Sequence, residues 1–316
     1  MEELKSFNRR KFLKGLVAVA ASSSLIGLPN TGLARKKNVK ITILHTNDVH
    51  SRIDPFPMDG SRLQGLGGVA RRSTLLKRIR QEEEQVLLFD AGDIFQGTPY
   101  YNIFGGKLEL QLMSELGYDA GTFGNHEFDN GLTGLAKHWD EAKFPFISSN
   151  YDFSNTILAG KVKEYMVFKR DGIKIGVFAV GVNLEGLVDP NSYKGVVIKD
   201  PIEVAQRMCK TLKTDLKCDL IICLSHIGYQ YDDDQVSDLI LAKNSRDIDL
   251  IIGGHTHTFL EKPTEVVNLD GKITLVNQTG RSGVNLGRID FIFDQQKKVQ
   301  RTIAYNYPID AQLDLV

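Results

Sequence analysis

Short apolar runs rich in β-branched residues alternate with amphipathic stretches along the first half of this chain. Apolar runs bounded by turn residues indicate buried strands, and apolar residues at helical spacing indicate helices packed on one face. The pattern predicts strands at 39–44, 86–89, 120–123 and 146–149. It predicts helices at 69–84, 108–116 and 132–142, the second of which ends at Gly117.

The second half continues this alternation and ends in a run of strands. Asp171-Gly172 lies between the apolar runs 164–169 and 173–180 and predicts a β-hairpin, because this dipeptide suits the tight turns that join such strands. Helices are expected at 202–212 and 236–242, and strands at 220–224, 250–252, 265–268, 274–277, 289–293 and 301–305. Alternating strands and helices favour α/β layers over a helical bundle.

The first thirty-four residues differ from the rest. A basic cluster at 8–14 precedes the apolar run Leu16–Leu28, which is shorter than the roughly 20 residues that a membrane-spanning helix needs. Small residues follow at 32–34, at the spacing of a cleavage site, and the cluster with Arg9 and Arg10 resembles a twin-arginine export signal. We therefore expect residues 1–34 to be a signal peptide and residues 35–316 to be one catalytic domain, periplasmic or otherwise exported and without membrane association after cleavage. A disordered cytosolic start and a retained membrane anchor are the alternatives.

The balance of charge narrows the choice of partners. The 316 residues include 39 Lys or Arg and 39 Asp or Glu, so the formal net charge is zero, and 42% of the residues are apolar. This composition is typical of a globular domain. It gives no reason to expect a nucleic-acid duplex as a partner.

Five short polar motifs each follow a predicted strand, which is where the ligand-binding loops of α/β sheets gather. They contain five of the seven histidines. Each motif alone is weak, because Asp-x-His pairs and Gly-Asp turns are common polar features, but together they indicate one shared site. The motifs are Asp48-Val49-His50, Gly92-Asp93, Gly124-Asn125-His126-Glu127, Ser225-His226 and Gly253-Gly254-His255-Thr256-His257.

The residue types in these motifs suit divalent metal ions. Imidazoles and carboxylates bind Zn, Mn or Fe, and one carboxylate can bridge two ions. Two cations about 3.5–4 Å apart can neutralise a phosphate ester, orient it and activate a water molecule. A helical His-Glu-x-x-His zinc site is excluded, because no pair of histidines has that spacing. The spacing of His255 and His257 would instead place both rings on one side of an extended strand or a turn.

Longer stretches around these motifs resemble a known family. Residues 46–50, 90–93, 124–127, His226 and 253–257 look like the complete signature of the calcineurin-like metallophosphoesterase superfamily. Residues 43–48, 93–99 and 125–129 are similar to its 5′-nucleotidase family, and the resemblance covers nearly all of the chain after the leader. It implies a four-layer α/β/β/α sandwich of the metallo-dependent phosphatase type, with the metal ions at the loop end of the strands.

The same resemblance implies a role for each motif residue. His126 would bind the phosphate and stabilise the transition state, and Asp129 would orient its ring, since a carboxylate partner keeps an imidazole protonated and aimed. We expect Glu127 to be structural. The two ions would be Mn, Zn, Fe or Co, one held by Asp48, His50 and His257 and the other by Asn125, His226 and His255, with Asp93 bridging them.

The implied activity is the release of phosphate from a 5′-nucleotide or a similar phosphomonoester by a metal-activated water. Hydrolysis of 2′,3′-cyclic nucleotides or of nucleotide sugars is an alternative, and so is a non-catalytic metal-binding subunit of a two-chain nucleotidase. Typical secreted members have a second, carboxy-terminal domain that binds the nucleobase, whereas this sequence ends at Val316. We therefore expect either activity of this domain alone on small or varied esters, or pairing with a separately encoded substrate-binding subunit.

Overall fold

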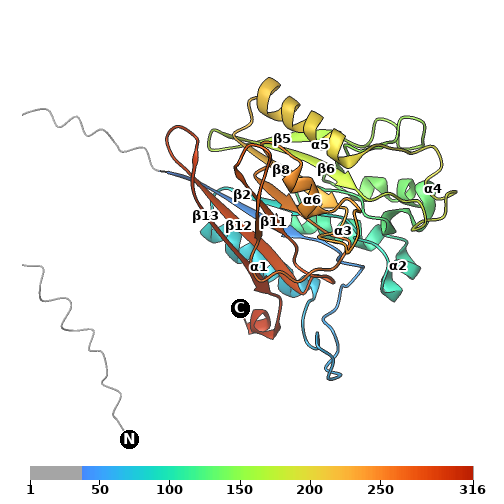
Figure 1. Ribbon diagram of the computed structural model, residues 1–316. Helices are drawn as coiled ribbons and strands as arrows, with labels where there is room; N and C mark the ends of the chain where they lie inside the picture. Colours follow the sequence, from blue (N-terminus) through green and yellow to red (C-terminus); the bar gives the residue numbers. More distant parts are fainter. Residues whose placement is uncertain (1–37, 316) are drawn as a thin grey trace, which may run out of the picture. The chain divides into compact units, whose positions relative to one another are not determined.

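Two β-sheets lie face to face at the centre of the protein, in a computed structural model that describes residues 38–315 (Figure 1). The first sheet has the strand order β13 (Val299–Pro308), β12 (Asn285–Phe293), β1 (Val39–Thr46), β2 (Val86–Asp90) and β3 (Ala120–Gly121). The second has the order β10 (Thr264–Val267), β11 (Ile273–Asn277), β9 (Leu250–Ile252), β8 (Leu220–His226), β6 (Ile173–Gly181) and β5 (Tyr165–Arg170). A separate pair joins β4 (Tyr151–Asp152) to β7 (Val197–Ile198). The predicted signal peptide, residues 1–34, lies outside the described residues.

The period-two alternation of side chains gives the sheets two different apolar faces. Ile222 and Leu224 of β8 pack between the sheets, against Ile41 and Ile43 of β1, in a shared inner core. Cys223 of β8 points the other way, toward the outer layer. Because both faces of the central strands are buried, these strands appear in the sequence as nearly unbroken apolar runs.

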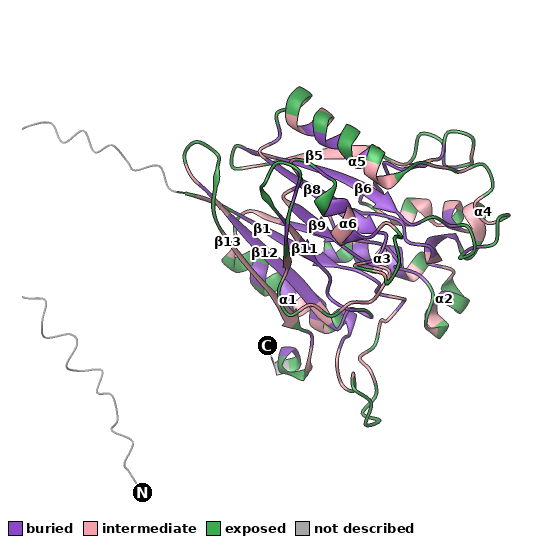
Figure 2. Ribbon diagram, viewed as in Figure 1, coloured by how far each residue is buried: buried purple, intermediate pink, exposed green. Residues whose placement is uncertain are grey.

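Helices cover the outer faces of both sheets and complete four layers, which confirms the α/β/β/α prediction (Figure 1). On the first sheet lie α1 (Val69–Glu82) and α3 (Lys107–Leu116), and on the second lie α5 (Pro201–Lys210) and α6 (Asp238–Lys243). Figure 2 shows the central strands buried and the outer side of α5 exposed. The remaining helices of the described residues are α2 (Pro99–Phe104), α4 (Gly131–Lys137), short 3-10 turns at His126–Phe128, Trp139–Glu141 and Ala311–Leu315, and a π turn at Thr211–Asp215. Within residues 38–315, no helix has the length and apolar character needed to cross a membrane.

Parallel pairing brings the carboxyl ends of the central strands to one edge of each sheet. Thr46 of β1 pairs with Asp90 of β2, and Asp90 is also in register with Gly121 of β3. In the second sheet Gly181 of β6 pairs with His226 of β8. The polar motifs leave the sheets at these ends, so the topology places their loops together.

Most of the predicted elements are present, and three differ for local reasons. The predicted helix 132–142 stops at Lys137, and the chain turns at His138 so that Trp139 packs against Phe123 and Phe146. Strand 120–123 is reduced to Ala120–Gly121. The predicted strand 146–149 is wrong: only isolated bridges form there, because the Ser148 and Ser149 hydroxyls accept the backbone N–H groups of Tyr151 and Ala179. The predicted hairpin is confirmed, with left-handed backbone at Asp171 (φ 43°) and Gly172 (φ 80°).

The position of the core between the two sheets predicts that replacing a buried isoleucine will destabilise the protein far more than replacing an exposed one. Replacing Ile222 by Ala removes a fully buried side chain and leaves a cavity, so we expect the free energy of unfolding to fall by about 2–5 kcal/mol. Ile157 is largely exposed, and Ile157→Ala should change it by no more than about 0.5 kcal/mol. Chemical denaturation of both variants measures the difference. Equal losses would contradict the proposed position of the core.

Candidate metal centre

Five loops bring the sequence-predicted metal residues to the edge where the parallel strands end. Asp48 and Asp93 follow β1 and β2, and Asn125 follows β3. His226 is the last residue of β8, and the His255 and His257 loop follows β9. Backbone bonds tie these loops together: Asp48 N–H donates to the Gly92 carbonyl at 2.9 Å, and Ser282 N–H donates to the Asp48 carbonyl at 2.6 Å. The site is therefore assembled from both sheets.

Two groups of potential ligand atoms share Asp93. Asp48, His50, Asp93 and His257 form one group, and Asp93, His226 and His255 form the other, with the ligand atoms of each group within 4.8 Å of one another. Asp48 Oδ1 lies 3.4 Å from His257 Nε2, and Asp93 Oδ2 lies 3.8 Å from His50 Nε2 and 3.2 Å from His226 Nε2. One carboxylate thus faces both groups, as a bridging ligand would.

Asn125 belongs to the second group. Its side chain is buried, and its Oδ1 lies 2.9 Å from His255 Nδ1. The His226 and His255 rings meet edge to face, with centroids 5.3 Å apart. All seven predicted metal residues therefore lie at one place.

Hydrogen bonds at the far side of the rings leave their other nitrogens directed at this centre. His226 Nδ1 lies 2.7 Å from the Ala91 carbonyl and donates to it, and His50 Nδ1 lies 3.3 Å from the Phe95 carbonyl. Each of these bonds leaves the Nε2 of its ring to face the centre, where it offers a lone pair when the ring is neutral. His226 Nε2 is buried without a hydrogen-bond partner among the described residues, and His50 Nε2 lies 2.9 Å from His257 Nε2. Lone pairs that converge in this way fit a divalent cation.

The backbone at the predicted ligands is left-handed. The φ angle is 50° at Asp48, 49° at His50, 55° at Asp93, 74° at His255 and 52° at His257. This conformation is uncommon for residues other than glycine, and it gathers at functional sites where the surrounding structure enforces it. The His255 and His257 segment is therefore a turn, not an extended strand, and its two rings join different ligand groups.

Two glycines in the motifs are required by close approach to the ligands. A Cβ at Gly124 would lie 2.1 Å from Asp93 Oδ1 and 2.6 Å from His226 Nε2. A Cβ at Gly254 would lie 2.7 Å from His226 Nδ1. The small residues in the motifs thus make room for the metal centre, in addition to forming turns.

The electrostatics of the centre are dominated by its buried carboxylates. Burial disfavours the charged form of His226, but Asp93 and Asp48 outweigh it and raise the pKa of His226 to about 10. Burial would raise the pKa of Asp93, yet the charge on His226 and His50 holds it well below its usual value. Burial lowers the pKa of His255 to about 4, so this ring is neutral near pH 7 and can offer a lone pair. The carboxylates therefore favour positive charge between them, whether a proton or a metal ion.

His126 and Asp129 stand beside the centre and remain partly exposed. His126 Nδ1 lies 2.9 Å from Asp129 Oδ2, and this hydrogen bond, together with Asp93, raises the pKa of His126 to about 8 against the effect of burial. The His126 backbone N–H donates to Asp93 Oδ1 at 2.9 Å, and its ring centroid is 5.3 Å from that of His50. A protonated imidazole is thus held next to the ligand groups.

Glu127 clamps two of the loops. Its carboxylate accepts the backbone N–H groups of Asp93 (2.9 Å), Ile94 (2.8 Å), Phe95 (3.2 Å) and Gly124 (2.6 Å). Burial and the charge of Asp93 raise the pKa of Glu127 to about 7, while the backbone bonds favour its ionised form. Glu127 was expected to be structural, and these bonds show how: its carboxylate fixes the backbone of Asp93.

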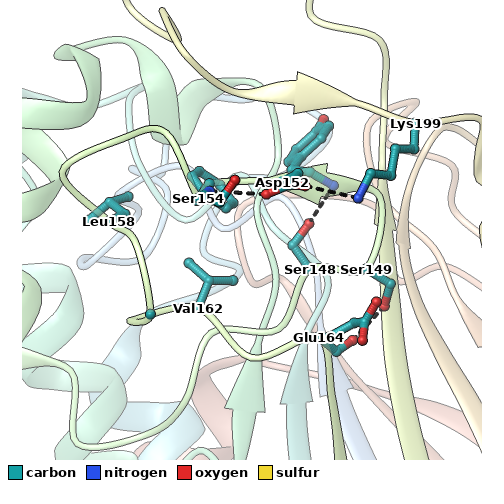
Figure 3. A pocket seen from close by; sticks show the side chains of 11 residues that line it. Ser148, Ser149, Asp152, Ser154, Leu158, Val162, Glu164 and Lys199 are labelled. Carbon is teal, nitrogen blue, oxygen red and sulfur yellow. Dashed lines mark hydrogen bonds and ion pairs between the residues drawn. The ribbon is translucent and has the colours of Figure 1, made fainter.

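A separate hollow of about 240 Å³ has a different chemistry (Figure 3). Asp152 and Lys199 point toward each other there and pair at 3.0 Å, and Ser154 N–H donates to Asp152. Its lining contains no histidine and none of the predicted site residues. Its polar groups bind one another. We therefore assign the metal site to the Asp and His cluster described above and not to this hollow.

The clamp predicts that Glu127→Gln destabilises the protein. An amide NH₂ placed against backbone N–H donors leaves some of them unsatisfied, so we expect the free energy of unfolding to fall by about 2–4 kcal/mol. Glu185→Gln, at an exposed carboxylate, serves as the control and should change it little. Urea denaturation measures both. A Glu127→Gln protein as stable as the control would show that the four bonds contribute little.

Comparisons with known proteins agree with this geometry. The sequence profile of the calcineurin-like phosphoesterases matches residues 41–259. The trifunctional nucleotide phosphoesterase protein YfkN of Bacillus subtilis (strain 168) is 37% identical over 293 aligned positions, which cover 82% of this chain and 18% of that protein. The 5′-nucleotidase of Homo sapiens is 34% identical over 287 positions, covering 82% of this chain and 48% of that protein.

The solved structures agree as well. A 5′-nucleotidase precursor from Thermus thermophilus superposes with a TM-score of 0.78 at 31% identity, covering 87% of this chain and 55% of that one. The chain thus spans about half, or less, of the length of these relatives. The profile match shows that the chain belongs to the calcineurin-like phosphoesterase family; its similar proteins include 5′-nucleotidases, and its Asp and His cluster has the residues to hold metal ions.

Proposed function

We propose that this chain is a phosphomonoesterase that uses two divalent ions and acts on 5′-nucleotides or similar esters. The observation that most supports two ions is Asp93, whose carboxylate faces both ligand groups. Asp48, His50 and His257 would hold one ion, and Asn125, His226 and His255 the other. When bound, such ions would neutralise the ester and lower the pKa of a water molecule.

His126 would act on the substrate directly. Its Nδ1–H is held by Asp129, so a protonated ring presents its Nε2–H to a phosphate oxygen beside the ligand groups. A fixed donor of this kind stabilises negative charge that develops in the transition state, and it needs no reorganisation during the reaction. Asp129 would position the ring and keep it charged.

The nucleotide is proposed from the relatives. Proteins named as 5′-nucleotidases and as a nucleotide phosphoesterase match most of this chain, although the chain covers only part of each. Cyclic nucleotides and nucleotide sugars remain the alternative substrates, since two-metal centres cleave these linkages too. A metal-binding subunit without catalysis is the alternative outside enzymes, and the His126 and Asp129 pair argues against it.

Export and a partner subunit complete the proposal. Residues 1–34 would direct a domain of residues 35–316 to the periplasm. Replacing both Arg9 and Arg10 by Lys should keep the protein in the cytoplasmic fraction, and unchanged export would refute a twin-arginine signal.

A separately encoded subunit would supply the nucleobase contacts if the chain alone binds nucleotides poorly.

A substrate panel tests the proposed activity. We expect the purified, metal-loaded protein to hydrolyse nucleoside 5′-monophosphates with a KM in the range of about 1 µM–1 mM, faster than cyclic nucleotides or nucleotide sugars. Chelation should abolish turnover and added Mn²⁺ should restore it, because the centre depends on cations. Phosphate release is the measurement. Ordinary kinetics of the isolated chain would refute the need for a partner, and hydrolysis of diesters alone would refute the monoesterase.

His126→Ala separates catalysis from metal binding. We expect turnover to fall by about 10²- to 10⁴-fold, because the fixed proton donor is lost, while the metal content measured by elemental analysis stays the same. His138→Ala is the matched control, since this histidine lies outside the centre on the turn after α4. Turnover within a few-fold of the wild type in His126→Ala would contradict the assigned role.

A further inference from the structure

Arg72, on the buried side of α1, has no direct partner for its charge. Its side chain is 3% exposed, its Nε is buried without a hydrogen-bond partner, and no carboxylate oxygen within residues 38–315 forms an ion pair with its guanidinium. Burial raises the pKa of Asp90 to about 7, and the charge of Arg72 opposes this rise only in part, without an ion pair between the two. An arginine stays charged in proteins, and a poorly compensated buried charge destabilises a fold. Some group that binds Arg72 is therefore expected at this place.

Glu109, on α3, is a buried carboxylate that also lacks a hydrogen-bond partner for one of its polar atoms. It is also 3% exposed, and its Oε1 accepts the Ser51 hydroxyl at 2.6 Å. Its second oxygen, Oε2, is buried without a hydrogen-bond partner among the described residues. Arg72 and Glu109 thus each have one unsatisfied polar atom, of opposite character.

Both residues line one small cavity between α1, α3 and the loop that follows β1. Its volume is about 10 Å³, close to the smallest space that holds one water molecule. The rest of its lining is largely apolar, including Ile53, Val69 and Leu112. A water here would accept from Arg72 and donate to Glu109, whereas the guanidinium disfavours a cation and the carboxylate disfavours an anion.

Ser51 connects this cavity to the metal centre. It is the last residue of the segment 48–51, which we call the His50 loop, and its own backbone is left-handed (φ 52°). Its N–H donates to the Ile94 carbonyl at 2.9 Å, and its carbonyl accepts the Thr98 hydroxyl at 2.8 Å. The side chain of Ser51 is held by its hydrogen bond to Glu109 on α3, a helix that carries none of the ligands.

We propose that Arg72 and Glu109 form a buried ion pair joined by one water molecule, and that Glu109 is a positioning residue for the His50 loop. Arg72 also lies close to the loop before β12, because a Cβ at Gly283 would be only 2.5 Å from its Nη1. Through Ser51 the pair contacts the His50 loop, whose Asp48 and His50 belong to the first ligand group. The proposal rests on the proposed function in one respect: Asp48, His50 and His257 must hold an ion.

Binding of Mn²⁺ to metal-free protein tests the positioning role. We expect two bound ions in the wild type. In Ser51→Ala and in Glu109→Leu, one ion should bind about tenfold more weakly, and the affinity for the other ion should be unchanged. A loss of this size is typical when a residue that supports a metal ligand is replaced. Glu109→Gln keeps an acceptor for Ser51 and should restore affinity to within about threefold. Glu115→Gln, at an exposed position of the same helix, is the control and should bind like the wild type.

The outcomes separate this proposal from the proposed function. Wild-type affinities for both ions in Ser51→Ala and Glu109→Leu would overturn the positioning role, whether or not the protein hydrolyses nucleotides. Equal weakening of both ions would overturn it too. If the wild type binds two ions but cleaves no phosphomonoester, the proposed function fails while the positioning role stands. Ser51→Ala alters no buried charge, so it decides the question if Glu109→Leu does not fold.

A double variant tests the ion pair itself. Glu109→Leu leaves Arg72 charged and without its bridged partner, so the combination of Arg72→Leu with Glu109→Leu should be more stable than Glu109→Leu, with an unfolding equilibrium constant lower by about tenfold. Denaturation of the metal-free proteins measures this constant. A double variant that shows only the product of the two single effects would overturn the water-joined pair.

Discussion

Carboxylates buried where the loops of the two sheets meet repel one another, and the structure around them can be understood as the means of holding them together. Asp48, Asp90, Asp93 and Glu127 are all buried at this edge. Carboxylates at such depth lose the solvation that stabilises their charge, so each needs its own compensation. Glu127 accepts four backbone N–H groups, and Asp90 accepts the Thr46 hydroxyl and the Gly92 N–H. Asp93 accepts the His126 N–H and Asp48 accepts the His255 N–H, and both carboxylates also face imidazoles. The remaining negative charge of this cluster attracts cations.

The same compensation makes the loops rigid before any ligand arrives. A ligand residue with left-handed backbone persists only where its surroundings enforce that conformation. The Glu127 clamp does this for Asp93, and the bonds around Ser51 do it for the His50 loop. Divalent ions bind best to groups that need little rearrangement. The strained backbone of these loops therefore favours metal binding, because it holds the ligands in position beforehand.

Local patterns in the sequence predicted α/β layers and one shared site, whereas the four-layer sandwich and the role of each site residue came from the resemblance to a known family. Apolar runs predicted the central strands, and polar motifs behind those runs predicted where ligands meet. Features that depend on distant partners were not predictable: the Glu127 clamp joins residues about thirty positions apart, and the wrong strand at 146–149 reflects serine hydroxyls that compete with the ladder. Helix α2 was missed because six residues are too few to show a helical period, although Pro99 at its start and Gly105 after its end were legible signs.

The position of β1 within its sheet also bears on how the chain reaches this state. This first strand lies between β2 and β12, and Val39 is paired with Phe293. A ribosome therefore has to release the chain through Phe293 before β1 can gain its second neighbour. Until then one edge of a very apolar strand is open to other chains, and pairing across such a distance is slow. Covering this edge until β12 pairs is a task suited to a chaperone, because open edges of incompletely folded chains aggregate.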